Sequence, residues 1–205
     1  PANSSFKHKV RFIIDGTTKY TSDFIAAGTT TIPYSIPHAW LPNHTSRTMT
    51  VQVLTYTSSE TYIAQKESTT SVTVPSSIVP TVSSITPTLL SGLSGKYVQG
   101  KSQVKLTVDG KAGEGATISS YIFTGTNIDG TSSSYTGSSN VKTSSVITTS
   151  GKITYSVQIK DSRGRYSTVK STDVTFEKYA SPEITSISAS RCFEDGTLDT
   201  NGTYA

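Results

Sequence analysis

Alternation of apolar and polar residues between Gly151 and Phe176 sets the strongest limit on how this chain can fold. Apolar side chains occupy every second position from Ile153 to Ile159, with polar side chains between them. This period is that of a β-strand with one buried face. The sequence Asp161-Ser162-Arg163-Gly164 then has turn chemistry, because Asp bonds nearby backbone groups and Gly accepts positive φ. A second strand is expected through Tyr166, Thr168, Val169, Val174 and Phe176.

Composition extends this interpretation to the whole chain of 205 residues. The sequence is 33% hydrophobic and only 16% charged, and it is rich in Thr and Ser. Thr suits strands and Ser suits turns. No long window shows the 3.6-residue period of a helix, so we expect an all-β protein with polar outer faces and almost no helix.

An internal repeat indicates how the chain is divided. Pro80-Thr81-Val82-Ser83-Ser84-Ile85 recurs as Pro182-Glu183-Ile184-Thr185-Ser186-Ile187, an offset of 182 − 80 = 102 positions. That spacing is close to the length of one β-sandwich. We therefore predict a first module over 1–79, a second over 80–181, and either the start of a truncated third module or an ordered tail over 182–205.

Strand patterns fill both modules. In the first, Phe6 to Ile14 is expected to form a strand before an Asp15-Gly16 turn, Lys19 to Ile25 returns, and Thr48 to Pro75 has the pattern of a hairpin. Between them, 31–43 carries three prolines, which remove ladder donors and predict an edge or a connection between sheets. In the second, Val104 to Val108 and Ile118 to Phe123 are predicted strands, and Asp129 to Asn140 is predicted as an exposed loop or weak edge strands.

Two stretches resemble known proteins. The 151–176 hairpin resembles the closing strands of immunoglobulin-like modules in bacterial and phage surface proteins. From Gly28 to Ile85, an Ile-Pro segment, Trp-Leu-Pro-Asn, Thr-Met-Thr-Val-Gln-Val-Leu-Thr-Tyr and Ser-Val-Thr-Val-Pro-Ser-Ser-Ile-Val-Pro-Thr-Val follow in order. This series is similar to the immunoglobulin-like repeats of minor structural proteins, of the tail or baseplate, from long-tailed siphophages that infect Gram-positive bacteria such as streptococci.

That resemblance implies a fold, a place and a set of partners. The expected fold is a pair of tandem immunoglobulin-like β-sandwiches. The expected place is the virion, in a tail tip, fibre or baseplate near the host-binding end, after synthesis in the bacterial cytoplasm. Its partners would be other phage tail proteins and further copies of itself, and the family offers no catalytic residues.

The core of the second module is expected to hold without a disulfide, since Cys192 is the only cysteine and is predicted to be a small buried hydrophobe. Tyr155 should turn its ring inward and its hydroxyl to a nearby backbone group, as the tyrosine corner of related sandwiches does. Val157 would then stand where antibody domains have a disulfide cysteine. The predicted buried layer is Val104, Leu106, Tyr121, Phe123, Ile153, Tyr155, Val157 and Phe176.

The sequence offers no recognisable reactive chemistry. The three histidines, His8, His38 and His44, lack the spacing of a metal site, and His8 is expected to be a core histidine. Glycosidase chemistry needs two facing carboxylates, and Glu114, Glu194 and Asp195 lie in turn-like contexts. We predict no enzymatic activity, no cofactor and no metal.

Charge and hydropathy bear on the partners. The net charge of +4 is carried by scattered Lys and Arg, which is typical of a solvated surface. The alternative is attraction to an anionic polymer such as wall teichoic acid or nucleic acid. No run of about 18 apolar residues is present, so we predict no membrane span. Of the two polymers, the scattered charge leads us to expect no nucleic acid among the partners.

One alternative function remains, in which a module is an adhesin for host cell-surface glycan or teichoic acid. Trp40, the only tryptophan, could fill the core or could stack on a sugar ring beside Asn43 and Arg47. Tyr34 shares its alternating register, and Tyr135 is the one aromatic residue of the Ser-rich 129–140 stretch. The candidate glycan-binding residues are therefore Trp40, Tyr34 and Tyr135.

Overall fold

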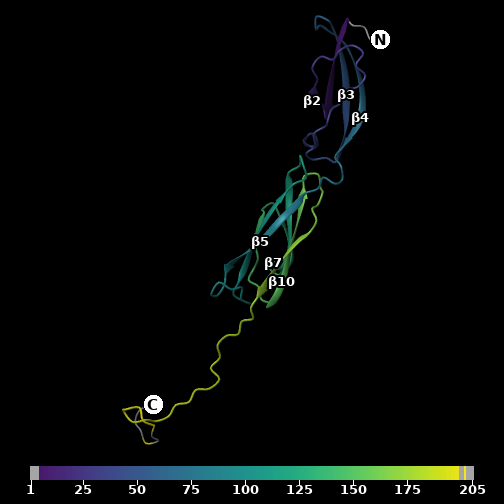
Figure 1. The fold of residues 1–205 in the computed structure, drawn as a ribbon. Coiled ribbons are helices and arrows are strands. Elements are labelled where there is room, and N and C mark those ends of the chain that lie inside the picture. Colours follow the sequence, from purple (N-terminus) through teal and green to yellow (C-terminus); the bar gives the residue numbers. More distant parts are fainter. Residues whose placement is uncertain (1–4, 199–200, 202–205) are drawn as a thin grey trace.

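The computed structural model describes residues 5–198 and 201, and it confirms an all-β fold of antiparallel sheets. Two elongated modules follow one another end to end, and the chain then runs out as a long C-terminal segment (Figure 1). The one helical element among the described residues is a single 3-10 turn, η1, at His38–Trp40.

The first module is built on one four-stranded antiparallel sheet. Its strands are β1 (Phe6–Ile14), β2 (Thr17–Thr21), β3 (Ser46–Thr57) and β4 (Tyr62–Thr73), in the order β2-β1-β3-β4. Asp15 and Gly16 make the β1–β2 turn with φ of 49° and 74°, as expected of an Asp-Gly pair. Alternation along β1 and β3 therefore aims one apolar face to one side of this sheet.

The irregular segment between β2 and β3 covers that face. The three prolines of 31–43 keep it out of any strand, and η1 turns Leu41 onto the sheet. Leu41 packs with Ile14, Met49, Val72 and Val74 in a small buried cluster. The expected connection is thus itself the layer that faces the sheet.

The second module is a two-sheet sandwich. One sheet has the order β11-β10-β7-β8 and the other β5-β6-β9. The strands are β5 (Thr81–Ser91), β6 (Gln103–Lys111), β7 (Ile118–Asp129), β8 (Ser132–Gly137), β9 (Val141–Thr143), β10 (Gly151–Asp161) and β11 (Lys170–Phe176). Of the two alternatives for 129–140, the edge strand is the one that forms, as β8 on β7.

All eight residues predicted for the core of the second module are buried in one cluster between its sheets. Tyr155 is fully buried, and its hydroxyl donates to the carbonyl oxygen of Thr126 at 3.5 Å. This confirms that the ring points into the core and that the hydroxyl reaches a backbone group, although Thr126 lies on β7 and not in the chain just before β10. The hydroxyl instead ties β10 to its neighbour in the same sheet.

The second strand of the 151–176 hairpin starts later than predicted. β11 begins at Lys170, and the side chains of Tyr166 and Val169 are 46% and 60% exposed. Ser167 explains the difference, because its N–H donates to the carbonyl of Ile159 and its hydroxyl accepts from the N–H of Ile159. Both backbone groups of Ile159 are thereby occupied, and regular pairing starts only at Val157↔Lys170.

The segment after β11 contains no strand of a sheet within the part that the structure describes. Ile184 and Ile187, from the repeated motif, are 76% and 83% exposed. Cys192 is only half-buried and makes an isolated bridge with Leu198, so its prediction as a buried core residue is wrong. Among the described residues, neither cluster of buried apolar side chains includes a residue of this segment.

Candidate functional site at the module junction

The turn between β10 and β11 is shaped by a buried carboxylate. Asp161 is 1% exposed, and its Oδ1 accepts from the backbone N–H of both Arg163 and Arg165, at 3.0 Å each. Gly164 has a φ of 81°, which closes the turn at a position where other residues would be strained. This geometry projects two arginine side chains from one end of the second module.

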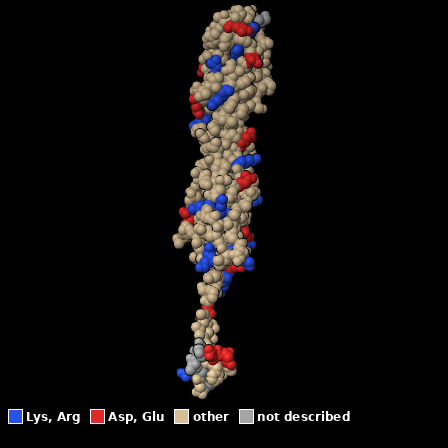
Figure 2. Space-filling view, turned by 90° about the vertical axis from the view of Figure 1, so that its left-hand side faces the viewer, with Lys and Arg blue, Asp and Glu red and all other residues tan. Residues whose placement is uncertain are grey.

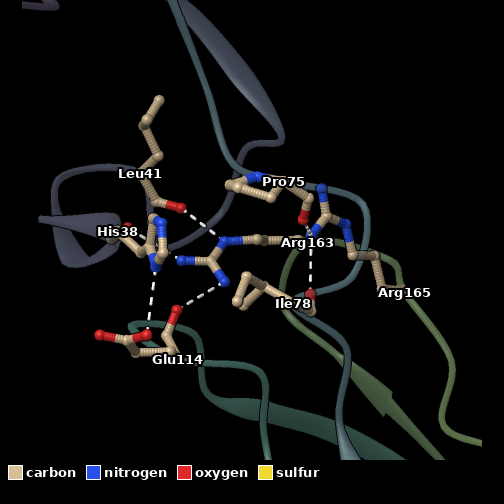
Figure 3. Close-up of polar contacts among 7 residues, drawn as sticks. All are labelled: His38, Leu41, Pro75, Ile78, Glu114, Arg163 and Arg165. Carbon is tan, nitrogen blue, oxygen red and sulfur yellow. Dashed lines mark hydrogen bonds and ion pairs between the residues drawn. The ribbon is translucent and has the colours of Figure 1, made fainter. Parts of the chain in front are cut away.

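Arg163 reaches across to the first module. Its Nε donates to the carbonyl oxygen of Leu41 at 2.8 Å and a terminal nitrogen donates to that of His38 at 2.9 Å (Figure 3). The other terminal nitrogen donates to the carbonyl of Glu114, in its own module, at 2.8 Å. Burial lowers the pKa of Arg163, and Asp161 opposes that shift. The guanidinium therefore links three backbone carbonyls, two from the first module and one from the second.

Arg165 holds the linker between the modules. Its guanidinium donates to the carbonyl oxygens of Val74, Pro75 and Ile78, at 2.7, 2.6 and 2.6 Å. These carbonyls follow β4 and precede β5, where the chain passes from one module to the other. A planar fork of donors is suited to several acceptors at once, which a lysine ammonium is not.

Further contacts close the junction. The Ser162 hydroxyl donates to the carbonyl of Pro42 at 2.6 Å, and His38 Nδ1 lies 3.2 Å from Glu114 Oε2. A Cβ placed on Gly115 would come within 2.5 Å of the Ala39 nitrogen. The backbones of the two modules therefore touch here, and we call this set of contacts the arginine junction.

The arginine junction is not predictable from the sequence. Asp161 to Gly164 is correctly predicted as a turn, but an arginine in a turn is ordinarily solvated, so nothing marks Arg163 as buried. The available signal is weak: two arginines two residues apart in a turn that also carries an Asp able to fix the loop.

The structure brings two of the three candidate glycan-binding residues together. The rings of Tyr34 and Trp40 stack with centroids 5.7 Å apart, and Tyr20 and Phe12 lie 4.2 and 5.3 Å from Tyr34. Trp40 is half-buried against the core of the first module, while Tyr34 is 37% exposed. Arg47, expected beside Trp40, instead pairs with Asp15 at 3.3 Å.

Tyr135 does not join this aromatic cluster. It lies on β8 of the other module, with its ring 6.4 Å from that of Phe123 and with Lys142 Nζ 3.8 Å above it. The ring of Tyr135 thus packs against the core on one side and against an ammonium group on the other.

The other candidates from the sequence form no reactive group. His8 is half-buried, and its Nδ1 lies 3.2 Å from the Thr55 hydroxyl. It lines an apolar hollow of about 640 Å³ between β1, β3 and the segment 25–32. Among residues 5–198 and 201, no three His, Cys, Asp or Glu side chains are grouped so that they could hold a metal ion.

The surface carries mixed charge. Figure 2 shows basic and acidic side chains interspersed along both modules on the face drawn. Several pair with one another, as Lys142 does with Asp129 at 2.7 Å and Lys96 with Glu177 at 2.8 Å. In the described part of the chain, no helix has the length and apolar character needed to cross a membrane.

Comparisons with known proteins bear on the family. A family model described as "Siphovirus protein of unknown function (DUF859)" matches residues 1–199. None of the curated protein sequences matches the chain. Among solved structures, the chain is similar to the fibronectin(III)-like modules of CbhA from Clostridium thermocellum. That likeness has 17% identity and a TM-score of 0.32, over 83% of this chain and 78% of that one.

Proposed function

This chain belongs to that siphovirus family, and we propose that it is a structural component of the phage tail, at the tail tip, fibre or baseplate. In this role the immunoglobulin-like modules are spacer and packing units near the host-binding end. Its partners are other tail proteins and further copies of the chain.

The arginine junction is the observation that supports a spacer. Arg163 and Arg165 donate five hydrogen bonds to backbone carbonyls of 38–78 and a sixth to Glu114. Hydrogen bonds from a charged donor contribute about 1.5 to 3 kcal/mol each. A linker between modules normally permits relative motion. Here the carbonyls of the linker are themselves bound, so the two modules are held at one angle along a common axis (Figure 1).

Electron microscopy of virions tests this role. Antibodies raised against the 205-residue chain should label purified particles on the tail, and gold particles should cluster at its distal end. The matched control is a phage carrying an epitope tag on its major capsid protein, which should be labelled on the head only. Absence of the chain from purified virions, or labelling confined to the head, would exclude the proposal.

We propose further that the chain has no catalytic activity. At the junction, His38 is engaged with Glu114, and Asp161 accepts from the backbone N–H groups of its own turn. A zymogram of host cell walls should therefore show no clearing by this chain, with lysozyme as the positive control.

Adhesion to host glycan is a second candidate, favoured by the part-exposed Tyr34 ring on its aromatic cluster. Whole-cell pull-down would then retain the chain, and Tyr34→Ala or Trp40→Ala would reduce retention without unfolding the protein. Tyr135→Ala serves as the control from the other module and should bind normally. Equal retention of all three variants would count against a glycan site at the aromatic cluster.

A further inference from the structure

One edge of the first module's sheet is open. β4 pairs with β3, and the sheet order β2-β1-β3-β4 leaves its other side without a neighbour among the described residues. The strand is 12 residues long, and nearly all its side chains are exposed. Such an edge is a template for a further strand unless charge or proline protects it. Lys66 and Glu67 lie in the middle of β4, but 68–73 is uncharged.

The direction of the free backbone groups follows from one hydrogen bond. The N–H of Val74 donates to the carbonyl of Thr45 at 2.8 Å, so Val74 faces β3. Backbone groups alternate in direction along an antiparallel strand. Ser71 and Thr73 therefore turn their N–H and C=O groups outward, away from β3.

A hollow with a mixed polar and apolar lining lies beside these outward groups. It has a volume of about 430 Å³, and it is lined by Ser71 and Thr73 together with Tyr34, Ile36, Leu41 and Val72. Outward backbone donors and acceptors next to a hollow that contains apolar side chains match recognition by strand addition. In that mode main-chain hydrogen bonds supply affinity and a pocket accepts a side chain.

The C-terminal segment has the complementary features. Its motif Pro182 to Ile187 repeats Pro80 to Ile85, the start of β5, which is an edge strand paired antiparallel to β6. In β5 the apolar residue Ile85 is buried, whereas its counterpart Ile187 is 83% exposed. The same sequence pattern therefore forms an edge strand when it lies beside β6. In the C-terminal segment it pairs with no sheet, and its isoleucines are exposed to solvent.

We propose that 181–190 of one copy adds as a strand to the β4 edge of a second copy, with Ile184 or Ile187 in the hollow beside Tyr34. Figure 1 shows the segment running away from its own first module, so the acceptor is another molecule. Each copy then offers one donor and one acceptor. Such a head-to-tail contact extends into a chain of copies rather than closing as a two-fold dimer.

Sedimentation velocity of the 205-residue protein over a wide concentration range tests the proposal. Reducing agent is present throughout, so that Cys192 cannot cross-link copies. The intact chain should associate as its concentration rises. Deletion of 181–205, or the pair Ile184→Lys and Ile187→Lys, should weaken association by about tenfold or more. The control pair Ser186→Lys and Ser188→Lys adds the same charge at polar positions and should weaken it much less.

The acceptor has its own pair of variants. Ser71→Pro removes an outward N–H without taking a bond from β3 and should abolish association, while Ser71→Ala keeps the N–H and should not. Both should melt within a few degrees of the parent. A chain that stays monomeric, or whose association survives either the deletion or Ser71→Pro, would overturn the proposal. Association lost on deletion but not in Ser71→Pro would mean that the segment binds elsewhere.

Discussion

The ring of Tyr155 lies against the backbone of Gly125, where a Cβ on that glycine would overlap the ring's Cδ1 atom. Gly125 is on β7 and has a φ of 151°, which side-chain-bearing residues rarely adopt. The glycine therefore makes room for the largest fully buried side chain of the core. A glycine is required at position 125 because of packing against Tyr155, not because of a turn.

Gly125→Ala should consequently destabilise the second module more than an ordinary glycine substitution. We expect a loss of about 2 to 4 kcal/mol, from backbone strain together with overpacking. Gly130→Ala is the control, since Gly130 also has a positive φ but a Cβ placed on it would meet no atom within 4 Å. Urea denaturation of the two variants compares them, and equal losses would show that the Tyr155 contact does not matter.

Tyr155 itself should be the residue on which the core depends most. Tyr155→Ala should cost roughly 3 to 5 kcal/mol, as large-to-small changes at buried aromatic residues do. Tyr155→Phe should cost about 1 kcal/mol or less, because the hydroxyl bond to Thr126 is long. Lys160→Ala, on the outward face of the same strand, should stay within about 0.5 kcal/mol. Urea melts would contradict this order if Tyr155→Ala unfolded no earlier than Lys160→Ala.

Alkaline pH should unfold the second module through the same residue. Burial, and to a lesser degree Tyr97, raises the pKa of Tyr155 to about 12 from its ordinary value of 10.0. Between these values the unfolded chain loses a proton that the folded chain keeps, so stability is intact below pH 10 and falls as pH rises towards 12. The loss is about 2 to 3 kcal/mol.

Comparison with Tyr155→Phe isolates this contribution. The variant has no phenol at this position, so its stability should decline less than that of the parent as pH rises from 10 to about 12. Tyr121, whose pKa burial also raises, remains in both proteins and cancels in the comparison. Parallel curves for parent and variant would contradict the assignment to Tyr155.

Period is enough to predict the buried layer of the second module and its strands β6, β7 and β10, but not where β11 begins. Alternation places Ile153, Tyr155 and Val157 on one face whatever lies opposite, so this face can be identified from the sequence. The hydrogen-bond partner of the Tyr155 hydroxyl cannot be identified from the sequence, because Thr126 is distant from Tyr155 along the chain. Which carbonyl accepts depends on how β7 and β10 are aligned.

The contacts of the arginine junction cannot be predicted from the sequence for a related reason. The acceptors of Arg163 are main-chain carbonyls, and any residue has one, so Leu41 and His38 carry no mark of the contact in their side chains. Similarly, strand alternation does not pair Tyr34 with Trp40, because their segment forms no strand. Their rings meet, and those of Tyr20 and Phe12 join them, only through the fold. Alternation along a strand depends on neighbouring residues, whereas the docking of two modules depends on residues that are far apart in the sequence.

The last prediction is that Arg163 fixes the angle between the modules and that lysine cannot replace it. Arg163→Ala removes this donor from the carbonyls of His38, Leu41 and Glu114, and the carbonyl of His38 keeps only the N–H of Leu41. Leu41 is buried, and leaving a buried carbonyl unsatisfied costs about 1 to 3 kcal/mol. Arg163→Lys keeps the charge but has one ammonium, which cannot reach three carbonyls in the geometry of a planar fork. In both variants each module should stay folded while the angle between them broadens. Residual dipolar couplings should therefore fit one common alignment tensor in the parent and two different tensors in the variants. Arg191→Ala removes an exposed arginine from the C-terminal segment and should behave as the parent does. A single shared tensor in Arg163→Lys would show that the charge alone, without the fork of donors, holds the junction.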